Sequence, residues 1–516
     1  MSNFMSAVQN TLNNEKSITE NGAVGYRTTG HALLDLNFAV ASMRSMTEDQ
    51  IARKFVDAFF EDRVLAMKWL FYARDVRGGL GERRLFRVVI KTMMGVDSHC
   101  VLPLISLIPE YGRWDDLWPL LDTPARDRVL AFVRGQFNAD WKNVRAGKPC
   151  SLLAKWMPSA NASSAETRRY ARLICDAFGL TERNYRKQLS AMRKALRVVE
   201  QQMSAKQWNE INYEIVPSRA NLLYNNAFLR NDESRRRAYL AALEKGQTKI
   251  NAGTLYPHDI VHKYMGGWSP RDYDATLEQL WKALPDTVKG CGNTIVVADG
   301  SGSMCCKVGG GNVSALSVAN ALAIYFAERS SGEFKDKYIT FSSRPQLVDL
   351  SGGKNLRDKL MIARQHDECS NTNIEAVFDL ILQTAVENDM PQEDLPQNVL
   401  ILSDMEFDGC ARCNSTVGYG YYNTKGIPST LFGAIAKKYA AHGYKLPRLV
   451  FWNLNSRTGT IPVKENDLGV ALVSGFSVNI VNMVMSGKLD PFECLLDVLN
   501  TERYAPIECA LAEANE

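Results

Sequence analysis

The sequence predicts a multidomain α + α/β protein, with an all-helical region followed by an α/β domain. Between about residues 45 and 285, apolar side chains recur at the three- and four-residue spacing of amphipathic helices. After Pro285, short apolar runs rich in β-branched residues alternate with helical segments. Such alternation is typical of βαβ units that build a parallel sheet. The 516 residues are enough for roughly two to four domains, each with a core of its own.

The composition is that of a globular protein in a reducing compartment. Hydrophobic residues make up 46% of the chain and charged residues 23%, which argues against a fibrous or disordered chain. The longest apolar stretch, 101–109, is too short to span a bilayer, and the N-terminus lacks the pattern of a signal peptide. The 11 cysteines are scattered and odd in number, which argues against a disulfide framework. We therefore expect a cytoplasmic protein without membrane contact.

The net charge of +4 hides an asymmetry between the two halves of the chain. Residues 1–290 hold 42 basic and 31 acidic side chains, whereas residues 291–516 hold 19 and 26. The basic excess is concentrated in residues 151–250, with 18 basic and 9 acidic side chains. A basic region of this kind predicts a polyanionic partner for the helical half.

Residues 1–44 are expected to form an irregular N-terminal arm, because they are polar and lack a periodic pattern. The helical region is expected to span residues 45–288. Its short helices and short turns favour stacked antiparallel pairs of HEAT or armadillo type, curved into a solenoid. The sequence has no clean repeat period, so this prediction depends on the helix pattern alone.

The glycine-rich segment RGGLGERR, which begins at Arg77, interrupts the helical pattern. It follows a predicted helix rather than a strand, so we expect a turn between helices and not a dinucleotide-binding loop. Basic side chains surround this turn. They form either a solvated face paired with Asp75 and Glu82 or a surface that contacts phosphate groups. The cluster consists of Arg74, Arg77, Arg83, Arg84 and Arg87.

Further basic side chains lie on two later predicted helices. In residues 181–202 an apolar stripe at helical spacing has basic residues beside and opposite it, and an earlier helix carries adjacent arginines. The candidates for phosphate contact on these helices are Arg168, Arg169, Arg172, Arg186, Lys187, Arg193 and Lys194. Phosphate contacts of this kind contribute to the affinity for a nucleic acid but not to recognition of its base sequence.

The α/β domain is expected to span residues 289–516. Its apolar runs are continuous, as expected for parallel strands buried on both faces. The predicted strands are 293–298, 338–342, 346–350, 398–402, 448–452 and 470–474. Because the carboxyl ends of parallel strands meet at one sheet edge, residues that follow these strands are expected to lie close together.

Oxygen-bearing side chains follow two of these strands and open one helix. The segment DGSGS begins directly after the first strand, Asp404 follows the strand NVLIL, and Thr372 precedes a helix. The expected ligand set is Asp299, Ser301, Ser303, Thr372 and Asp404. It contains no sulfur or imidazole and suits a hard divalent cation, Mg²⁺ or Mn²⁺. The alternatives are a polar strand–helix turn without metal and a metal that is only structural.

This D-x-S-x-S…T…D pattern resembles the metal-ion-dependent adhesion site of von Willebrand factor A domains, which have a Rossmann-like fold. The segments RDVRGGLGERRLFR, SDMEFD, VFWNLN and VSGFS resemble an uncharacterised family with a helical region fused to such a domain. That family is similar in turn to Ro-type (TROVE) RNA-binding proteins, whose ring of helical repeats is closed by an A domain. The resemblance implies a non-enzymatic ribonucleoprotein component that binds small non-coding RNA, structured or with single-stranded ends. It also implies that the metal leaves one position for an outside acidic group.

Two other functions and one other metal site remain open at this point. The A domain could bind an Asp or Glu of a protein partner through its metal, with the helical region as a platform. A haloacid-type phosphatase would need a second carboxylate two residues after Asp299, where this chain has Ser301. Cys410 and Cys413 have zinc-like spacing, but the adjacent Cys305 and Cys306 suit one ion poorly, so packed or free thiols are the other interpretation.

Overall fold

The computed structural model describes residues 16–265, 270–288, 293–309, 311–341, 344–367, 373–408, 431–462, 470–481 and 490–514. The chain divides into two compact units. The sheet unit consists of Met1–Arg63 and Leu255–Asn500, and the helical unit consists of Val64–Thr254 and Thr501–Glu516. The predicted boundaries at residues 44 and 288 do not coincide with these units, because helices on both sides of the helical region pack in the sheet unit.

The sheet unit contains a six-stranded mixed sheet. The predicted architecture, a helical region followed by an α/β region, is confirmed. The strand order is β5-β4-β3-β6-β7-β8. All neighbours are parallel except β5, which pairs antiparallel to β4 at the edge. The strands are β3 (Thr294–Asp299), β4 (Lys337–Phe341), β5 (Gln346–Asp349), β6 (Asn398–Ser403), β7 (Arg448–Asn453) and β8 (Val470–Ser474).

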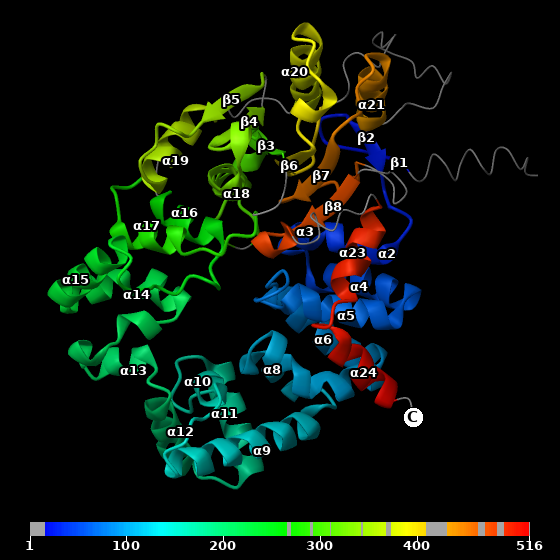
Figure 1. The fold of residues 1–516 in the computed structure, drawn as a ribbon. Helices are drawn as coiled ribbons and strands as arrows, with labels where there is room; N and C mark the ends of the chain where they lie inside the picture. The colour runs from blue at the N-terminus through cyan, green and yellow to red at the C-terminus, as the bar shows by residue number, and fades with distance from the viewer. Residues whose placement is uncertain are drawn as a thin grey trace, which may run out of the picture. The chain divides into compact units, whose positions relative to one another are not determined.

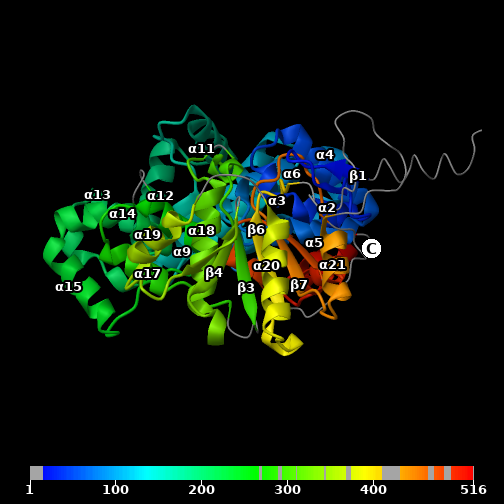
Figure 2. The ribbon, with the colours of Figure 1, turned by 90° about the horizontal axis from the view of Figure 1, so that it is seen from above.

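Helices cover both faces of this sheet and bury its central strands on both sides. The run TIVVAD of β3, in which every residue is buried, illustrates this. Helix α18 (Ala315–Arg329) packs against β3, β4 and β6, and α20 (Ile374–Glu387) and α21 (Leu431–Ala441) pack together over the other face (Figure 2). This is the arrangement that right-handed crossovers produce when strand order reverses in the middle of the sheet. Helices α19 (Leu356–Gln365) and α23 (Pro491–Leu499) complete this part of the unit.

The N-terminal part of the chain is more ordered than the predicted arm. A hairpin of β1 (Lys16–Ile18) and β2 (Val24–Tyr26) is followed by α2 (Ala32–Phe38), α3 (Val40–Met43) and α4 (Glu48–Glu61). Helix α2 packs on β8, and α16 (Pro257–Tyr264) and α17 (Ala275–Lys282) pack near α18. The contact between α2 and β8 buries apolar side chains of α2, although the overall polar composition of residues 1–44 predicted an irregular arm.

The helical unit is built of short helices, and none of its described residues forms a strand. Its first half comprises α5 (Arg63–Arg74), α6 (Arg83–Val96), α7 (Ser98–Val101), η1 (Leu102–Leu107), α8 (Ile108–Tyr111), η2 (Trp114–Asp122) and α9 (Arg126–Arg145). Its second half comprises α10 (Leu153–Trp156), α11 (Ala165–Phe178), α12 (Glu182–Ala195), α13 (Val199–Ser204), α14 (Ser218–Asn231) and α15 (Glu233–Glu244).

The last helix of the chain belongs to the helical unit. Helix α24 (Ala505–Glu513) packs against η1, so the C-terminal helix lies beside a segment about 400 residues earlier in the same unit (Figure 1). Glu508 of α24 pairs with Lys68, whose side chain is only 3% exposed, at 2.9 Å. Among the described residues, no helix has the length and apolar character needed to cross a membrane.

Candidate functional site

The order in which strands are added to the sheet reverses between β3 and β6. Strands β3 and β6 are neighbours, and their next strands, β4 and β7, lie on opposite sides of them. The helices that follow β3 and β6 therefore cover opposite faces of the sheet. Asp299 ends β3, and Asp404 comes directly after β6. The fold thus brings the two predicted carboxylates to the place where open α/β sheets bind ligands.

Asp299 is 1% exposed and is held by two donors. Its Oδ1 accepts a hydrogen bond from the backbone N–H of Ser301 at 2.9 Å, and its Oδ2 accepts one from the Ser403 hydroxyl at 2.6 Å. Burial raises the pKa of Asp299 above its ordinary value, and the charge of Asp404 raises it further. Two buried carboxylates that interact electrostatically favour either a shared proton or a bound cation.

The two serines of the predicted set lie together on the turn after β3. Their hydroxyl oxygens, of Ser301 and Ser303, are 3.0 Å apart. Gly300 in this turn is closely approached, because a Cβ there would lie 3.0 Å from the Thr340 hydroxyl oxygen and would require that side chain to shift. Ser301 is buried and Ser303 is half-buried, so Ser303 lies toward solvent. Burial raises the pKa of Asp404, and a hydrogen bond with the Ser303 side chain partly offsets this increase.

Asp404 is as buried as Asp299 and starts a tight turn. Its Oδ1 accepts from the backbone N–H of Glu406 at 3.3 Å, and Met405 between them adopts a left-handed φ of +64°. Its Oδ2 lies 3.4 Å from Nη2 of Arg457. Backbone strain of this kind is often found where a turn must present a particular side chain.

The donor chemistry fits a hard divalent cation. Two buried carboxylates and two adjacent hydroxyls offer oxygen ligands, and the rest of the coordination shell would be water. Thr372, the fifth predicted ligand, lies outside the described residues. In the part of the chain that the structure describes, no three His, Cys, Asp or Glu side chains gather as metal ligands. A cation here would therefore depend on the serine hydroxyls.

Of the two cysteine pairs considered for zinc, the structure describes one. Cys305 and Cys306 are exposed thiols on the loop that carries Ser303. Cys410 and Cys413 lie outside the described residues. The zinc site therefore stays a prediction.

The sequence analysis missed Glu406, the carboxylate that organises the loops beside this site. It is 0% exposed, and its two oxygens accept from the backbone N–H groups of Glu20 at 3.0 Å, Arg457 at 2.8 Å and Thr458 at 2.9 Å. The hydroxyl of Thr458 adds contacts of 3.0 Å to both oxygens. The acidic residue two positions after Asp404 in SDMEFD was the available signal. Glu406 joins the N-terminal hairpin to the loop after β7.

The basic cluster at the glycine-rich turn is largely engaged inside the helical unit. Arg74 is 1% exposed and binds Asp116 through Nε at 2.8 Å and Nη2 at 2.7 Å. Arg87 binds the other oxygen of Asp116 at 2.7 Å, and Arg83 pairs with Asp115. Arg74 is therefore corrected from a phosphate contact to a buried structural residue. The remaining two members of the cluster, Arg77 and Arg84, are exposed.

The later basic residues divide in the same way. The guanidinium of Arg193, which is half-buried, donates to the carbonyls of Ala154 and Met157 and to the Ser159 hydroxyl. Arg168 donates to two carbonyl oxygens at 2.6 Å, and Arg169 forms a bidentate pair with Asp122. Arg172 forms a weaker surface pair with Glu182, 3.5 Å long.

Helix α12 presents the accessible basic surface. Tyr185, Leu189 and Met192 face the core. On the opposite face, the exposed basic residues are Arg183, Arg186, Lys187 and Lys194, here called the α12 stripe. Within the described part of the chain, no carboxylate pairs with the α12 stripe. It is the strongest candidate for contact with a polyanion.

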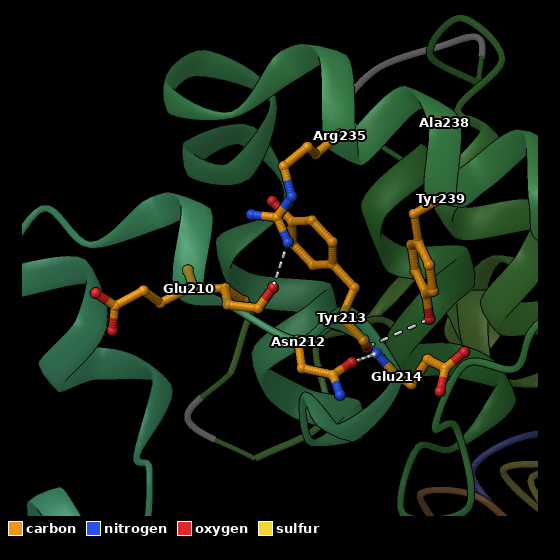
Figure 3. A pocket seen from close by; sticks show the side chains of 8 residues that line it. Glu210, Asn212, Tyr213, Glu214, Arg235, Ala238 and Tyr239 are labelled. Atoms are coloured by element: carbon orange, nitrogen blue, oxygen red, sulfur yellow. Dashed lines mark hydrogen bonds between the residues drawn. The ribbon is translucent and has the colours of Figure 1, made fainter.

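The helical unit also has a shallow pocket of about 420 Å³. Figure 3 shows its lining, with Tyr213 between Arg235 and Tyr239. Arg235 already donates to the Ile211 carbonyl at 2.8 Å and pairs with Asp232 at 3.0 Å, and the Tyr239 hydroxyl donates to the Lys249 carbonyl at 2.7 Å. The polar groups of Arg235 and Tyr239 are therefore already engaged within the unit.

Comparison with known proteins places both candidate sites in matched regions. Residues 293–502 match a domain of unknown function, DUF7788, and residues 176–293 match another, DUF2828. Uncharacterized protein L728 of Acanthamoeba polyphaga mimivirus is 31% identical over 540 residues, which cover 95% of this chain and 88% of the viral protein. The chain belongs to the same family as L728. In this L728-family chain, Asp299 and Asp404 fall in the DUF7788 match and the α12 stripe falls in the DUF2828 match.

Proposed function

We propose that this chain is a non-enzymatic RNA-binding protein resembling Ro-type proteins. The sheet unit would be a von Willebrand factor A-like domain that holds one Mg²⁺ or Mn²⁺, and the helical unit would hold the RNA. The strand order supports the A-like fold, since the two carboxylates flank its point of reversal with hydroxyls beside them. Asp299, Ser301, Ser303 and Asp404 would hold the ion, which would supply a positive charge for an outside anion.

The observation that carries the RNA proposal is the α12 stripe. Arg186, Lys187 and Lys194 are exposed on one face of a helix, in the segment with twice as many basic as acidic side chains. Such a face neutralises phosphates without reading bases, and its binding weakens steeply with salt. Small non-coding RNA with a structured stem and a single-stranded end is the proposed ligand.

The experiment compares the full-length protein with a variant carrying Arg186→Glu, Lys187→Glu and Lys194→Glu. Binding of a stem–loop RNA with a single-stranded tail is measured against salt concentration. The slope of log affinity against log salt should fall by roughly 2, since each lost phosphate contact on a single strand contributes roughly 0.7. Arg193 is left intact because it holds the segment from Ala154 to Ser159.

A matched control reverses three exposed basic residues on or just after α9, namely Lys142, Arg145 and Lys148. It changes the net charge equally and should leave most of the affinity. Equal losses in both variants would indicate a diffuse charge effect rather than a site on α12. Mn²⁺ uptake should be the same in all three proteins.

The second candidate function is a metal-dependent protein scaffold. It is favoured by the half-buried Ser303, which marks the solvent side of the candidate metal site where a partner's Asp or Glu could approach. If the α12 variant binds RNA as well as the wild type does, this function takes the place of the first. A phosphatase of haloacid type is disfavoured because Ser301 occupies the position of its acid.

A further inference from the structure

Arg457 places a positive charge beside the candidate metal site. Its Nη2 lies 3.4 Å from Oδ2 of Asp404 and 2.8 Å from Oε2 of Glu20. Asp404 is 1% exposed on its side chain, whereas Arg457 is 32% exposed and Glu20 is 47% exposed. The guanidinium therefore bridges a buried carboxylate of the site and an accessible carboxylate of the N-terminal hairpin.

This bridge is fixed by the backbone on both sides. Glu406 accepts from the N–H of Glu20 through Oε2 and from the N–H of Arg457 through Oε1. The hairpin is tied to the same loops, because Tyr26 and Ile461 exchange backbone hydrogen bonds of 2.8 Å. The positions of Glu20 and Arg457 relative to Asp404 are thus set by buried bonds rather than by surface side chains alone.

A divalent ion on Asp404 would be close to this guanidinium. Mg²⁺ lies about 2.1 Å from its carboxylate ligands, and Oδ2 of Asp404 is already near Nη2 of Arg457. Two cations that share one buried carboxylate repel each other, because a buried carboxylate lies in a region of lower effective dielectric than bulk water. The ion gains most from Asp404 when the guanidinium is drawn away toward Glu20.

We propose that Arg457 is an internal cation that competes with the divalent metal for Asp404, and that Glu20 favours metal binding by holding Arg457. The N-terminal hairpin would in this way set the affinity of the site. This inference rests on the proposed metal site and adds the residues that regulate it.

The test measures Mn²⁺ binding to the full-length protein by electron paramagnetic resonance, with calorimetry for Mg²⁺. Arg457→Ala should bind Mn²⁺ about tenfold more tightly than wild type, equivalent to about 1.4 kcal/mol. Arg457→Lys, which keeps the charge, should remain near wild type. Glu20→Gln should bind more weakly than wild type, because it releases the guanidinium onto Asp404.

The double variant Arg457→Ala with Glu20→Gln separates the two roles. If Glu20 acts through Arg457, the double variant binds as tightly as Arg457→Ala alone. If Glu20→Gln weakens binding equally in both backgrounds, Glu20 acts on the ion directly and the inference is overturned.

Lys307→Ala provides the matched control. Lys307 is an exposed cation on the loop after Ser303, with its Nζ 3.3 Å from Asn312, and should have little effect. Equal tightening by Lys307→Ala and Arg457→Ala, or no tightening by Arg457→Ala, would overturn the competition while leaving the metal site. No uptake by wild type or by Arg457→Ala would overturn the proposed metal site together with the competition, and would leave the RNA proposal to its own test.

Discussion

Arg503 binds Asp75 across 428 residues of sequence. Nη2 of Arg503 donates to Oδ1 of Asp75 at 2.8 Å, and its Nε donates to Oδ2. The Tyr504 hydroxyl donates to the same Oδ2 at 3.2 Å. Asp75 is 0% exposed, so the segment before α24 supplies the charge that a buried carboxylate at the glycine-rich turn requires.

We expect Arg503→Met to destabilise the helical unit by about 3 kcal/mol. The change leaves Asp75 buried without its cation, and breaking a buried ion pair from one side costs about 3–5 kcal/mol. Urea unfolding followed by tryptophan fluorescence measures this loss. Arg172→Met is the control, because its pair with Glu182 is 67% and 52% exposed and should change stability by less than about 0.5 kcal/mol. Similar losses in the two variants would contradict the role given to Asp75.

Two glycines should respond to alanine with opposite signs. A Cβ at Gly79 would lie 1.9 Å from the Tyr72 carbonyl oxygen, so Gly79→Ala must move backbone and should cost about 3 kcal/mol or more. A Cβ at Gly95, which is exposed within α6, meets nothing within 4 Å. Gly95→Ala should therefore stabilise the unit by about 0.5–1 kcal/mol, because alanine loses less backbone entropy in a helix. Thermal unfolding of the two variants tests both signs.

The parts of the fold that could be predicted are those set by local pattern. The apolar run of β3 and the acid that follows it are adjacent in sequence, so their place at the sheet edge followed from parallel pairing. The hairpin of β1 and β2 was missed because its strands have three residues each and are stabilised by contacts with Phe407 and Ile461, nearly 400 residues or more away.

The sequence predicted where charged residues cluster, but not which of these residues are accessible to a ligand. Arg74 and Arg87 looked available for phosphate because their partner Asp116, in a later segment, has no sequence signal that marks it as buried. Likewise, nothing in the sequence distinguishes Glu406 from other acidic residues, although its oxygens accept three backbone N–H groups in the fold. Which charges remain accessible depends on tertiary packing, and Arg186 and Lys187 are accessible because the apolar stripe of α12 faces the core.

Asp122 should give the helical unit a specific acid sensitivity. Its bidentate hydrogen bonds with Arg169 lower the pKa of Asp122 from 3.8 to about 2, with help from the Tyr170 hydroxyl. A lowered folded-state pKa adds stability above the unfolded value, and this stability is lost as pH falls through the folded value. The stability difference between wild type and Asp122→Asn should therefore be constant above pH 5 and shrink between about pH 4 and pH 2.

Denaturant unfolding at a series of pH values measures this difference. Glu233→Gln is the control, since its pair with Arg237 is 60% and 70% exposed and should add no comparable change. A wild-type advantage that persisted unchanged at pH 2 would contradict the assignment to Asp122.

The metal site predicts opposite effects of Asp299→Asn with and without a divalent ion. In chelator, the variant should be at least as stable as wild type, because it removes one of two buried like charges and keeps an oxygen that accepts from Ser301. With Mg²⁺ at one hundred times its dissociation constant, wild type should gain about 2.7 kcal/mol and the variant nothing. Thermal unfolding of the sheet unit in chelator and in Mg²⁺, with Mn²⁺ resonance for uptake, measures both effects. Equal stabilisation of the two proteins by Mg²⁺ would show that the ion binds elsewhere and would contradict the site at Asp299 and Asp404.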